Sequence, residues 1–278
     1  MIIDSHCHAW AFFPYQPPVP DPETRGSFEQ LRYEMDSHGV DRALIVCAEI
    51  EHNPDNNQYV YEKTFEQRDR FAFVIDVDSF WTSTYHRPGA VERLAVGIAR
   101  WRPAGFTHYI ADPAEDAAWL TSSDGMALFE LAQTEGILAS IHCRPQHQKH
   151  IRALAKRFPR LTILMHHMGH PKALEPEGLS DILATARQDN VTVKVSGFYN
   201  STTMPPWDYP LSDVQPIVNA LYQRFGGSRL LWGSDYPVCR GYFSYRHAIE
   251  IMRRHCDFIP PADMDAVMGG NLAALLGA

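Results

Sequence analysis

The first eight residues, Met1–His8 (MIIDSHCH), form a short apolar run that ends in two histidines. Seven similar runs follow along the chain: Arg42–Ala48, Phe71–Val77, Ala95–Trp101, Gly136–Cys143, Leu161–His167, Val191–Gly197 and Arg229–Tyr236. The runs are continuously apolar more than they alternate, which is typical of parallel strands buried on both faces. The sequence therefore predicts eight buried parallel strands.

Helical patterns lie between most of these runs. In Ser27–His38, the residues Phe28, Leu31 and Met35 recur at the spacing of one helix face. Further helices are predicted over Asn57–Arg68, Met126–Glu135, His147–Phe158, Leu179–Gln188, Val214–Phe225, Tyr245–His255 and Ala262–Leu276. This alternation predicts an α/β protein, a single (β/α)8 TIM barrel spanning residues 1–278 as one domain. A doubly wound open sheet is the alternative, but the glycine-rich phosphate loop that it requires after the first strand is missing from the sequence.

Composition excludes several classes of protein. A hydrophobic fraction of 45% with 21% charged residues is too apolar for a disordered chain. The net charge of −8 argues against nucleic acid or an anionic membrane surface as the main partner. No apolar run reaches the roughly 18 residues that cross a bilayer. The five cysteines are scattered without a C-x-x-C pair, as expected for free thiols in a reducing compartment, so we expect a cytoplasmic protein.

Two histidines end the first predicted strand. Residues two apart in a strand point to the same side, so His6 and His8 can both enter the barrel while Cys7 faces the helices. Two neutral imidazoles side by side suit a divalent metal ion such as zinc. The H-x-H pair therefore indicates a candidate metal site.

Three other predicted strands also end in His or Asp. His142 ends the fifth, the pair His166–His167 ends the sixth and Asp235 ends the eighth. Because His166 and His167 are adjacent, only one is expected to point inward. Buried ionisable groups are costly unless they are paired or bind a metal, so this set predicts one site on the face where barrel enzymes place their chemistry. Asp4, inside the first strand, is expected to be structural and hydrogen-bonded.

Taken in order along the chain, these strand-end residues resemble those of the amidohydrolase superfamily. The motifs around them are similar to those of its amidohydrolase-2 branch of lactonases and decarboxylases. The resemblance spans nearly the whole chain. It is carried by Ile3–His8 (IDSHCH), His167–Pro171 (HMGHP), Lys194–Gly197 (KVSG), Gly233–Pro237 (GSDYP) and Gly270–Ala273 (GNLA).

The resemblance implies a role for each group. His6, His8, His142 and Asp235 would bind one divalent metal ion, with zinc expected. Asp235 would also take a proton from metal-bound water, and His167 would stabilise the developing oxyanion or move a proton. Binuclear members carry a lysine or glutamate at the end of strand four. That end is predicted here as Ile98–Arg102, which has neither, so one metal is expected.

The sequence also departs from its relatives. Similar lactonases, such as the pyrone dicarboxylate type, often lack the strand-five histidine and work without metal, and they usually have Asp where His166 stands. His142 therefore favours a metal enzyme, whereas the motifs taken together favour a lactonase. A slip in strand register would turn Cys143 or Arg144 inward in place of His142.

Arginines near the predicted strand ends indicate an anionic substrate. Arg100 or Arg102 after the fourth run, Arg144 after the fifth and Arg240 after the eighth fall on the expected catalytic face. Arginine suits bidentate binding of a carboxylate. We therefore expect Arg102, Arg144 and Arg240, with Tyr199, to contact the substrate.

The predicted function is metal-dependent hydrolysis of a small carboxylated or sugar-acid lactone, with Asp235 as the base. One alternative is a decarboxylase or hydratase acting on an unsaturated carboxylic acid on the same fold. Another is a barrel that binds a metabolite or metal without catalysis, although such a protein would not need a base at Asp235. The expected partner is a small anionic or cyclic ester metabolite, with neither nucleic acid nor membrane involved, and a homo-oligomer is left open.

Overall fold

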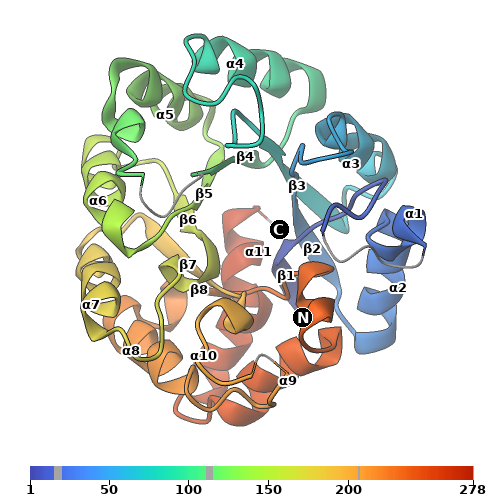
Figure 1. Ribbon diagram of the computed structural model, residues 1–278, viewed down its shortest axis with the longest axis vertical. Coiled ribbons are helices and arrows are strands. Elements are labelled where there is room, and N and C mark those ends of the chain that lie inside the picture. The colour runs from blue at the N-terminus through green and yellow to red at the C-terminus, as the bar shows by residue number, and fades with distance from the viewer. Residues whose placement is uncertain (16–20, 111–114, 206, 278) are drawn as a thin grey trace.

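The computed structural model describes residues 1–15, 21–110, 115–205 and 207–277. Within them, one eight-stranded sheet runs in sequential order from β1 to β8, and every strand pair is parallel. The strands are β1 (Ile3–Cys7), β2 (Arg42–Val46), β3 (Phe71–Asp76), β4 (Gly105–Tyr109), β5 (Leu138–His142), β6 (Ile163–Met165), β7 (Val191–Val195) and β8 (Leu230–Trp232). Figure 1 looks along the barrel, with the strands at the centre and the helices in a ring around them. The predicted (β/α)8 barrel is therefore confirmed.

The first and last strands meet and close the sheet. A single parallel bridge joins Cys7 to Tyr236. The backbone N–H of His8 donates to the carbonyl oxygen of Tyr236 at 2.7 Å, and that of Asp235 donates to His6 at 2.7 Å. Closure therefore brings side chains from the two ends of the sequence to the same place.

Each strand is followed by at least one helix. They are α1 (Pro22–Arg25), α2 (Phe28–His38), α3 (Asn56–Thr64), α4 (Ala90–Trp101), α5 (Ser123–Glu135), α6 (Gln148–Arg157), α7 (Pro176–Ala184), α8 (Gln215–Phe225), α9 (Tyr245–His255), α10 (Pro261–Asp265) and α11 (Asn271–Leu275). The hydroxyls of Ser27, Ser122 and Ser244 accept from backbone N–H groups in the first turns of α2, α5 and α9. Such N-caps satisfy donors that the helix itself leaves open.

The predicted fourth strand is wrong. Ala95–Trp101 lies within α4, where Leu94 and Gly97 are buried at helical spacing. A side chain at Gly97 would put its Cβ 2.4 Å from Ile75 Cδ1, so glycine allows the helix to pack closely on β3. The actual fourth strand is β4, with the sequence GFTHY. It contains a buried threonine and a buried histidine, so its composition differs from that of the more apolar strands.

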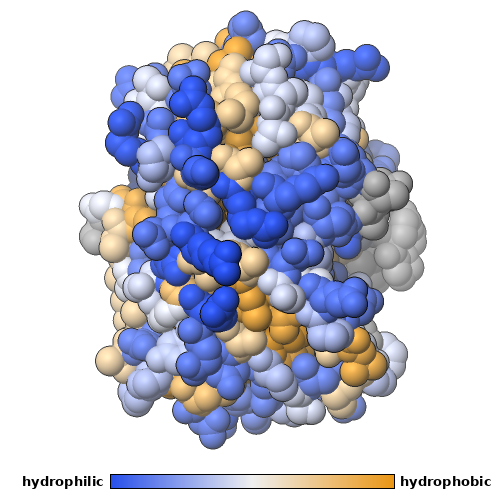
Figure 2. Space-filling view, turned by 90° about the vertical axis from the view of Figure 1, so that its left-hand side faces the viewer, coloured by the Kyte–Doolittle hydropathy of each residue, from blue (hydrophilic) through white to orange (hydrophobic). Residues whose placement is uncertain are grey.

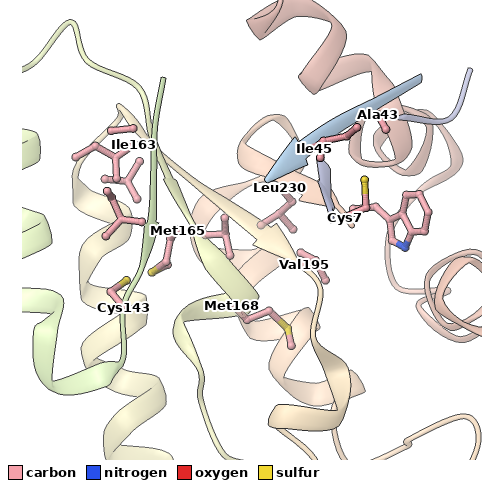
Figure 3. Close-up of a cluster of buried hydrophobic side chains, with 14 of the residues drawn as sticks. Cys7, Ala43, Ile45, Cys143, Ile163, Met165, Met168, Val195 and Leu230 are labelled. Atoms are coloured by element: carbon pink, nitrogen blue, oxygen red, sulfur yellow. The ribbon is translucent and has the colours of Figure 1, made fainter. Parts of the chain in front are cut away.

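Two apolar layers hold the barrel together. The outer layer lies between strands and helices, and Figure 3 shows part of it, with Cys7, Ile45, Met165 and Leu230 among the labelled residues. The inner layer lies inside the barrel and includes Ile3, Leu44, Leu164 and Leu231, against which α11 packs through Leu272 and Ala273. The two layers together bury the strands on both faces, which explains why the runs do not alternate. All five cysteines are buried and free, as predicted.

The outside of the molecule is mixed in character. Figure 2 shows a flank that is mainly hydrophilic, with apolar side chains in smaller patches between the charged ones. Among the described residues, no helix combines the length and the apolar character needed to cross a bilayer.

Candidate active site

A cleft of about 700 Å³ opens at the C-terminal ends of the strands. Its polar lining includes His8, His142, Arg144, His167, His170, Lys172, Tyr199, Asp235 and Arg240. These residues come from the ends of β1, β5 and β6 and from the loops after β7 and β8. The cleft is therefore built on the face where barrel enzymes carry their chemistry.

His6 and His8 both point into the barrel, and Cys7 lies in the outer layer. The two imidazole rings lie 5.1 Å apart at 82°. The Nδ1 atom of His8 lies 2.7 Å from the carbonyl oxygen of Val46, and since a carbonyl only accepts, Nδ1 carries the proton. Its Nε2 atom then presents a lone pair to the cleft. His6 is fully buried, and among the described residues neither of its nitrogens has a hydrogen-bond partner.

His166 and His167 both point inward, so the expectation that only one would do so is wrong. β6 ends at Met165, and the chain then turns through left-handed backbone, with φ of 47° at His167, 60° at Met168 and 57° at His170. Strand alternation no longer applies in such a turn. The rings of His166 and His167 lie 4.5 Å and 4.4 Å from the ring of His6.

His167 is fixed by the loop after β7. Its Nδ1 atom lies 3.0 Å from the hydroxyl oxygen of Ser196. A Cβ atom at Gly197 would lie 2.6 Å from the same Nδ1 atom, so glycine makes room for the ring. Burial lowers the pKa of His167 to about 4, although the charge of Asp235 opposes the shift. The imidazole of His167 is therefore neutral near pH 7.

Asp235 lies among these histidines. Its Oδ1 atom is 3.6 Å from Nε2 of His6 and 3.5 Å from Nε2 of His8, and its Oδ2 atom accepts a 2.5 Å hydrogen bond from the Tyr199 hydroxyl. Burial acts to raise the pKa of Asp235, but the attraction of His167 and His8 in their protonated forms and the hydrogen bond from Tyr199 outweigh it, so the pKa is lowered. The carboxylate is therefore ionised at neutral pH and can act as a base.

Two overlapping groups of side chains fit a metal ion. His6, His8 and Asp235 form one group, and His6, His166 and His167 form the other; the ligand atoms within each group lie within 4.8 Å of one another. The unpartnered nitrogens of His6 and the set of imidazole and carboxylate donors suit zinc or a similar divalent ion. The residues present therefore fit the metal that the sequence led us to expect.

His142 lies on the wall of the cleft, outside both groups. Its ring stacks on Tyr109 at 4.9 Å and lies 4.5 Å from His170. Its ring centre is 6.3 Å from those of His166 and His167. His142 is thus in neither group of close ligand atoms, and the set of His6, His8, His142 and Asp235 stays a prediction.

The end of β4 bears on the number of metal ions. The prediction of one metal was drawn from Ile98–Arg102, which belongs to α4 and its C-cap. The true strand ends at Tyr109 and is followed by Ile110. Since neither residue is lysine or glutamate, the bridging side chain is also missing from Gly105–Ile110.

The predicted arginines fall at different places. Arg144 and Arg240 line the cleft, whereas Arg102 caps the C-terminal end of α4, just before β4, at the opposite end of the barrel. The assignment of Arg102 to the substrate is therefore wrong, and its cause is the misplaced fourth strand. Arg25 and Lys172 also line the cleft, although no motif marks them in the sequence.

Asp4 is structural, as predicted. It is fully buried and accepts hydrogen bonds from the backbone N–H of Ser234 at 2.9 Å, from its hydroxyl at 2.5 Å and from the Tyr245 hydroxyl at 2.9 Å. Burial raises the pKa of Asp4 to about 6, against these hydrogen bonds. Asp4 thus ties β1 to the segment that carries Asp235.

Comparison of the sequence with known proteins gives matches of different extent. A family model described as amidohydrolase matches residues 3–278. Over 136 residues, or 46% of this chain, the sequence is 35% identical to an L-fucono-1,5-lactonase of Burkholderia ambifaria. The match spans 45% of that relative's length, which is less than half of it.

Two solved structures share the fold over the whole chain. One is an amidohydrolase from Burkholderia multivorans with bound zinc, with a TM-score of 0.82 and 20% identity, covering 100% of this chain and 99% of that one. The other is a "probable 2-pyrone-4,6-dicarboxylic acid hydrolase" from Acinetobacter baumannii with bound citric acid, with a TM-score of 0.75 and 18% identity over the same shares. At these identities, the likeness supports the fold alone.

Proposed function

Because the chain belongs to the amidohydrolase family, we propose that it is a hydrolase that opens the ring of a small carboxylated or sugar-acid lactone. The observation that carries this proposal is the buried carboxylate of Asp235, which is kept ionised beside three imidazoles next to an open cleft. A general base must be deprotonated and within reach of its water. The similarity to an L-fucono-1,5-lactonase supports a cyclic ester as the substrate.

Different residues of the cleft carry out different steps of the proposed ring opening. Asp235 accepts the proton of the attacking water, and a divalent ion held by His6, His8 and Asp235, with zinc proposed, would polarise the ester carbonyl when bound. His167 Nδ1 lies 4.0 Å from Asp235 Oδ2, so His167 can pass this proton to the ring oxygen that leaves. The proton removed from water thus ends on the new hydroxyl group.

The rim of the cleft supports an anionic substrate. Arg25, Arg144, Lys172 and Arg240 all line it, in a chain whose net charge is −8. Cations gathered at one opening attract a small anion and orient its carboxylate. We therefore propose that the carboxylate or the hydroxyl-rich end of the lactone faces these four side chains.

A lactone panel tests the proposed reaction. Purified protein is incubated with sugar-acid lactones and carboxylated lactones, and ring opening is followed by acid release. Asp235→Asn should lower kcat by about 10²- to 10⁴-fold, which is the usual contribution of a general base. Asp181→Asn, at an exposed site on α7, is the matched control and should keep full activity. Full turnover by Asp235→Asn contradicts the mechanism, and release of carbon dioxide without ring opening would identify a decarboxylase instead.

Removal of metal tests the ion separately. After chelation and dialysis, we expect hydrolysis to be lost and to return with about one equivalent of zinc per chain. Full activity in demetallated protein would contradict the role of the ion and leave Asp235 as the base.

A further inference from the structure

A buried lysine lies beside the histidines, away from the cleft lining. Lys194 on β7 is fully buried, and its Nζ atom donates to the Ser140 hydroxyl oxygen at 2.8 Å. The same oxygen lies 2.7 Å from Nε2 of His166. Lysine, serine and imidazole thus form one chain of hydrogen bonds across β7, β5 and the end of β6. Enclosing a lysine is costly, so a side chain kept there has a specific partner to hold.

The direction of donation determines the state of His166. Burial lowers the pKa of Lys194 to about 7, so at pH 6.5 its amine is mainly an ammonium group. An ammonium group has protons to donate and no lone pair, so Ser140 must accept from it. The serine keeps its own proton, for which His166 Nε2 is the acceptor at hydrogen-bond distance. A neutral imidazole that accepts at Nε2 carries its proton on Nδ1. Neither nitrogen of His166 then has a free lone pair.

This state separates the two candidate metal groups. We propose that Lys194, acting through Ser140, withholds His166 from metal binding and thereby directs a divalent ion to His6, His8 and Asp235. Lys194 is a positioning residue in this proposal, because it acts on the histidines through the serine. The inference rests on the proposed function only in assuming that the protein binds a metal.

The charges around the two candidate metal groups favour the same choice of ligands. The group formed by His6, His166 and His167 contains no carboxylate, and the ammonium group of Lys194 interacts repulsively with protonated His6 and His166. A second cation among them would meet the same repulsion. The other group contains the carboxylate of Asp235, which attracts a divalent ion. Hydrogen bonding and charge therefore favour the same group.

Zinc binding in four proteins tests the inference. Equilibrium dialysis at pH 6.5 compares the wild type, Asp235→Asn, Asp235→Asn/Lys194→Met and Asp235→Asn/Ser140→Ala. Asp235→Asn should bind zinc at least about 100-fold more weakly than the wild type, because one group has lost its carboxylate and the other is withheld. Each double variant should bind zinc at least about tenfold more tightly than Asp235→Asn, because His166 is then free to bind with His6 and His167.

Controls separate this effect from general disturbance of the fold. Asp235→Asn/Lys156→Met removes a lysine from α6, which lies outside the barrel, and should bind zinc as weakly as Asp235→Asn. Ser140→Ala keeps the buried lysine, so it still tests the proposal if Lys194→Met fails to fold. Cobalt absorption spectra report the ligand set, which should change from one carboxylate and two imidazoles to three imidazoles.

Three results would overturn the inference. They are a wild type that binds no zinc, an Asp235→Asn protein that binds zinc as tightly as the wild type, and folded double variants that bind no better than Asp235→Asn. Because zinc is measured directly, a failure to hydrolyse any lactone leaves this result unchanged. The two proposals can therefore fail independently.

Discussion

At the residue scale, the base strength of Asp235 depends on Tyr199. The tyrosine hydroxyl donates to Oδ2 and helps to lower the pKa of the carboxyl group. Tyr199→Phe removes that donor, so the pKa of Asp235 should rise and the acid limb of the kcat/KM profile should move to higher pH by up to about one unit. A pH–rate profile measures the shift. Tyr222→Phe, which removes a similar bond to Asp263 outside the cleft, should leave the profile unchanged.

Arg144 provides a second prediction for a single residue. If its guanidinium binds the substrate carboxylate, Arg144→Met should raise KM by about 10- to 100-fold, the cost of a hydrogen bond to a charged group. The effect on kcat should be smaller. Arg102→Met is the matched control, since Arg102 lies at the other end of the barrel. Steady-state kinetics on the best lactone measures both variants, and equal effects would contradict the assignment.

Sequence reasoning at this scale succeeded where side-chain direction follows strand geometry. His6 and His8 enter the barrel together because they stand two apart in β1. His166 stands two residues after the inward-facing Leu164 and keeps that side, but the inward direction of His167 could not be predicted, because it depends on a left-handed turn that follows a three-residue strand. The hydrogen bond from Tyr199 to Asp235 joins two loops whose relative position only the closed barrel defines.

At the scale of elements, the loop after β7 holds the ring of His167. Gly197 has a φ of 59°, and a Cβ atom there would lie 2.6 Å from His167 Nδ1. Gly197→Ala should therefore cost about 1–2 kcal/mol in backbone strain and also displace the imidazole, lowering kcat by at least about tenfold. Denaturant unfolding and steady-state kinetics measure the two effects.

Gly39 provides the control for that experiment. It has a φ of 67° at the end of α2, and nothing lies within 4 Å of an added Cβ atom. Gly39→Ala should therefore lower stability by a similar amount and leave kcat unchanged. If both variants lose activity equally, the loss reflects backbone strain alone and His167 is not positioned by the glycine.

The same scale shows where pattern reading fails. Ala95–Trp101 contains as many apolar residues as a strand, but it continues the helical spacing that begins at Ala90. β4 follows it closely and carries Thr107 and His108 in buried positions, so its composition is unlike that of the other strands. Of these polar side chains, His108 has its Nδ1 atom 3.0 Å from the carbonyl oxygen of Val77, whereas the Thr107 hydroxyl has no hydrogen-bond partner among the described residues, and no local pattern reveals either position. The false position of this strand produced the error at Arg102.

For the whole molecule, buried neutral histidines predict stability that falls in acid. The histidines whose pKa is lowered, mainly by burial, include His6, His108, His142, His166, His167 and His170. Their contribution to the free energy of unfolding is full above pH 6.5, about the pKa of histidine in the unfolded chain. It is lost as the pH falls toward 4. Burial raises the pKa of Asp4 and Asp76 to about 6 and of Glu49 to about 8, and these acids act in the opposite sense but are fewer. The free energy of unfolding of demetallated protein should therefore fall by several kcal/mol between pH 7 and 4.5.

Urea unfolding at a series of pH values measures this slope. His108 lies outside the cleft, and burial lowers its pKa to about 4. His108→Gln should therefore reduce the slope by the equivalent of about one proton taken up on unfolding. His52→Gln, at an exposed position, should leave the slope unchanged. Constant or increasing stability on acidification would show that the buried acids outweigh the histidines.

The closure of the barrel between β1 and β8 also has a consequence in time. A ribosome makes His6 and His8 more than two hundred residues before Asp235. The hydrogen bonds that place them together form only when the last strand joins the first. Until then, the imidazoles of β1 lack their carboxylate, and the proposed capacity to activate water arises in one step when the barrel closes.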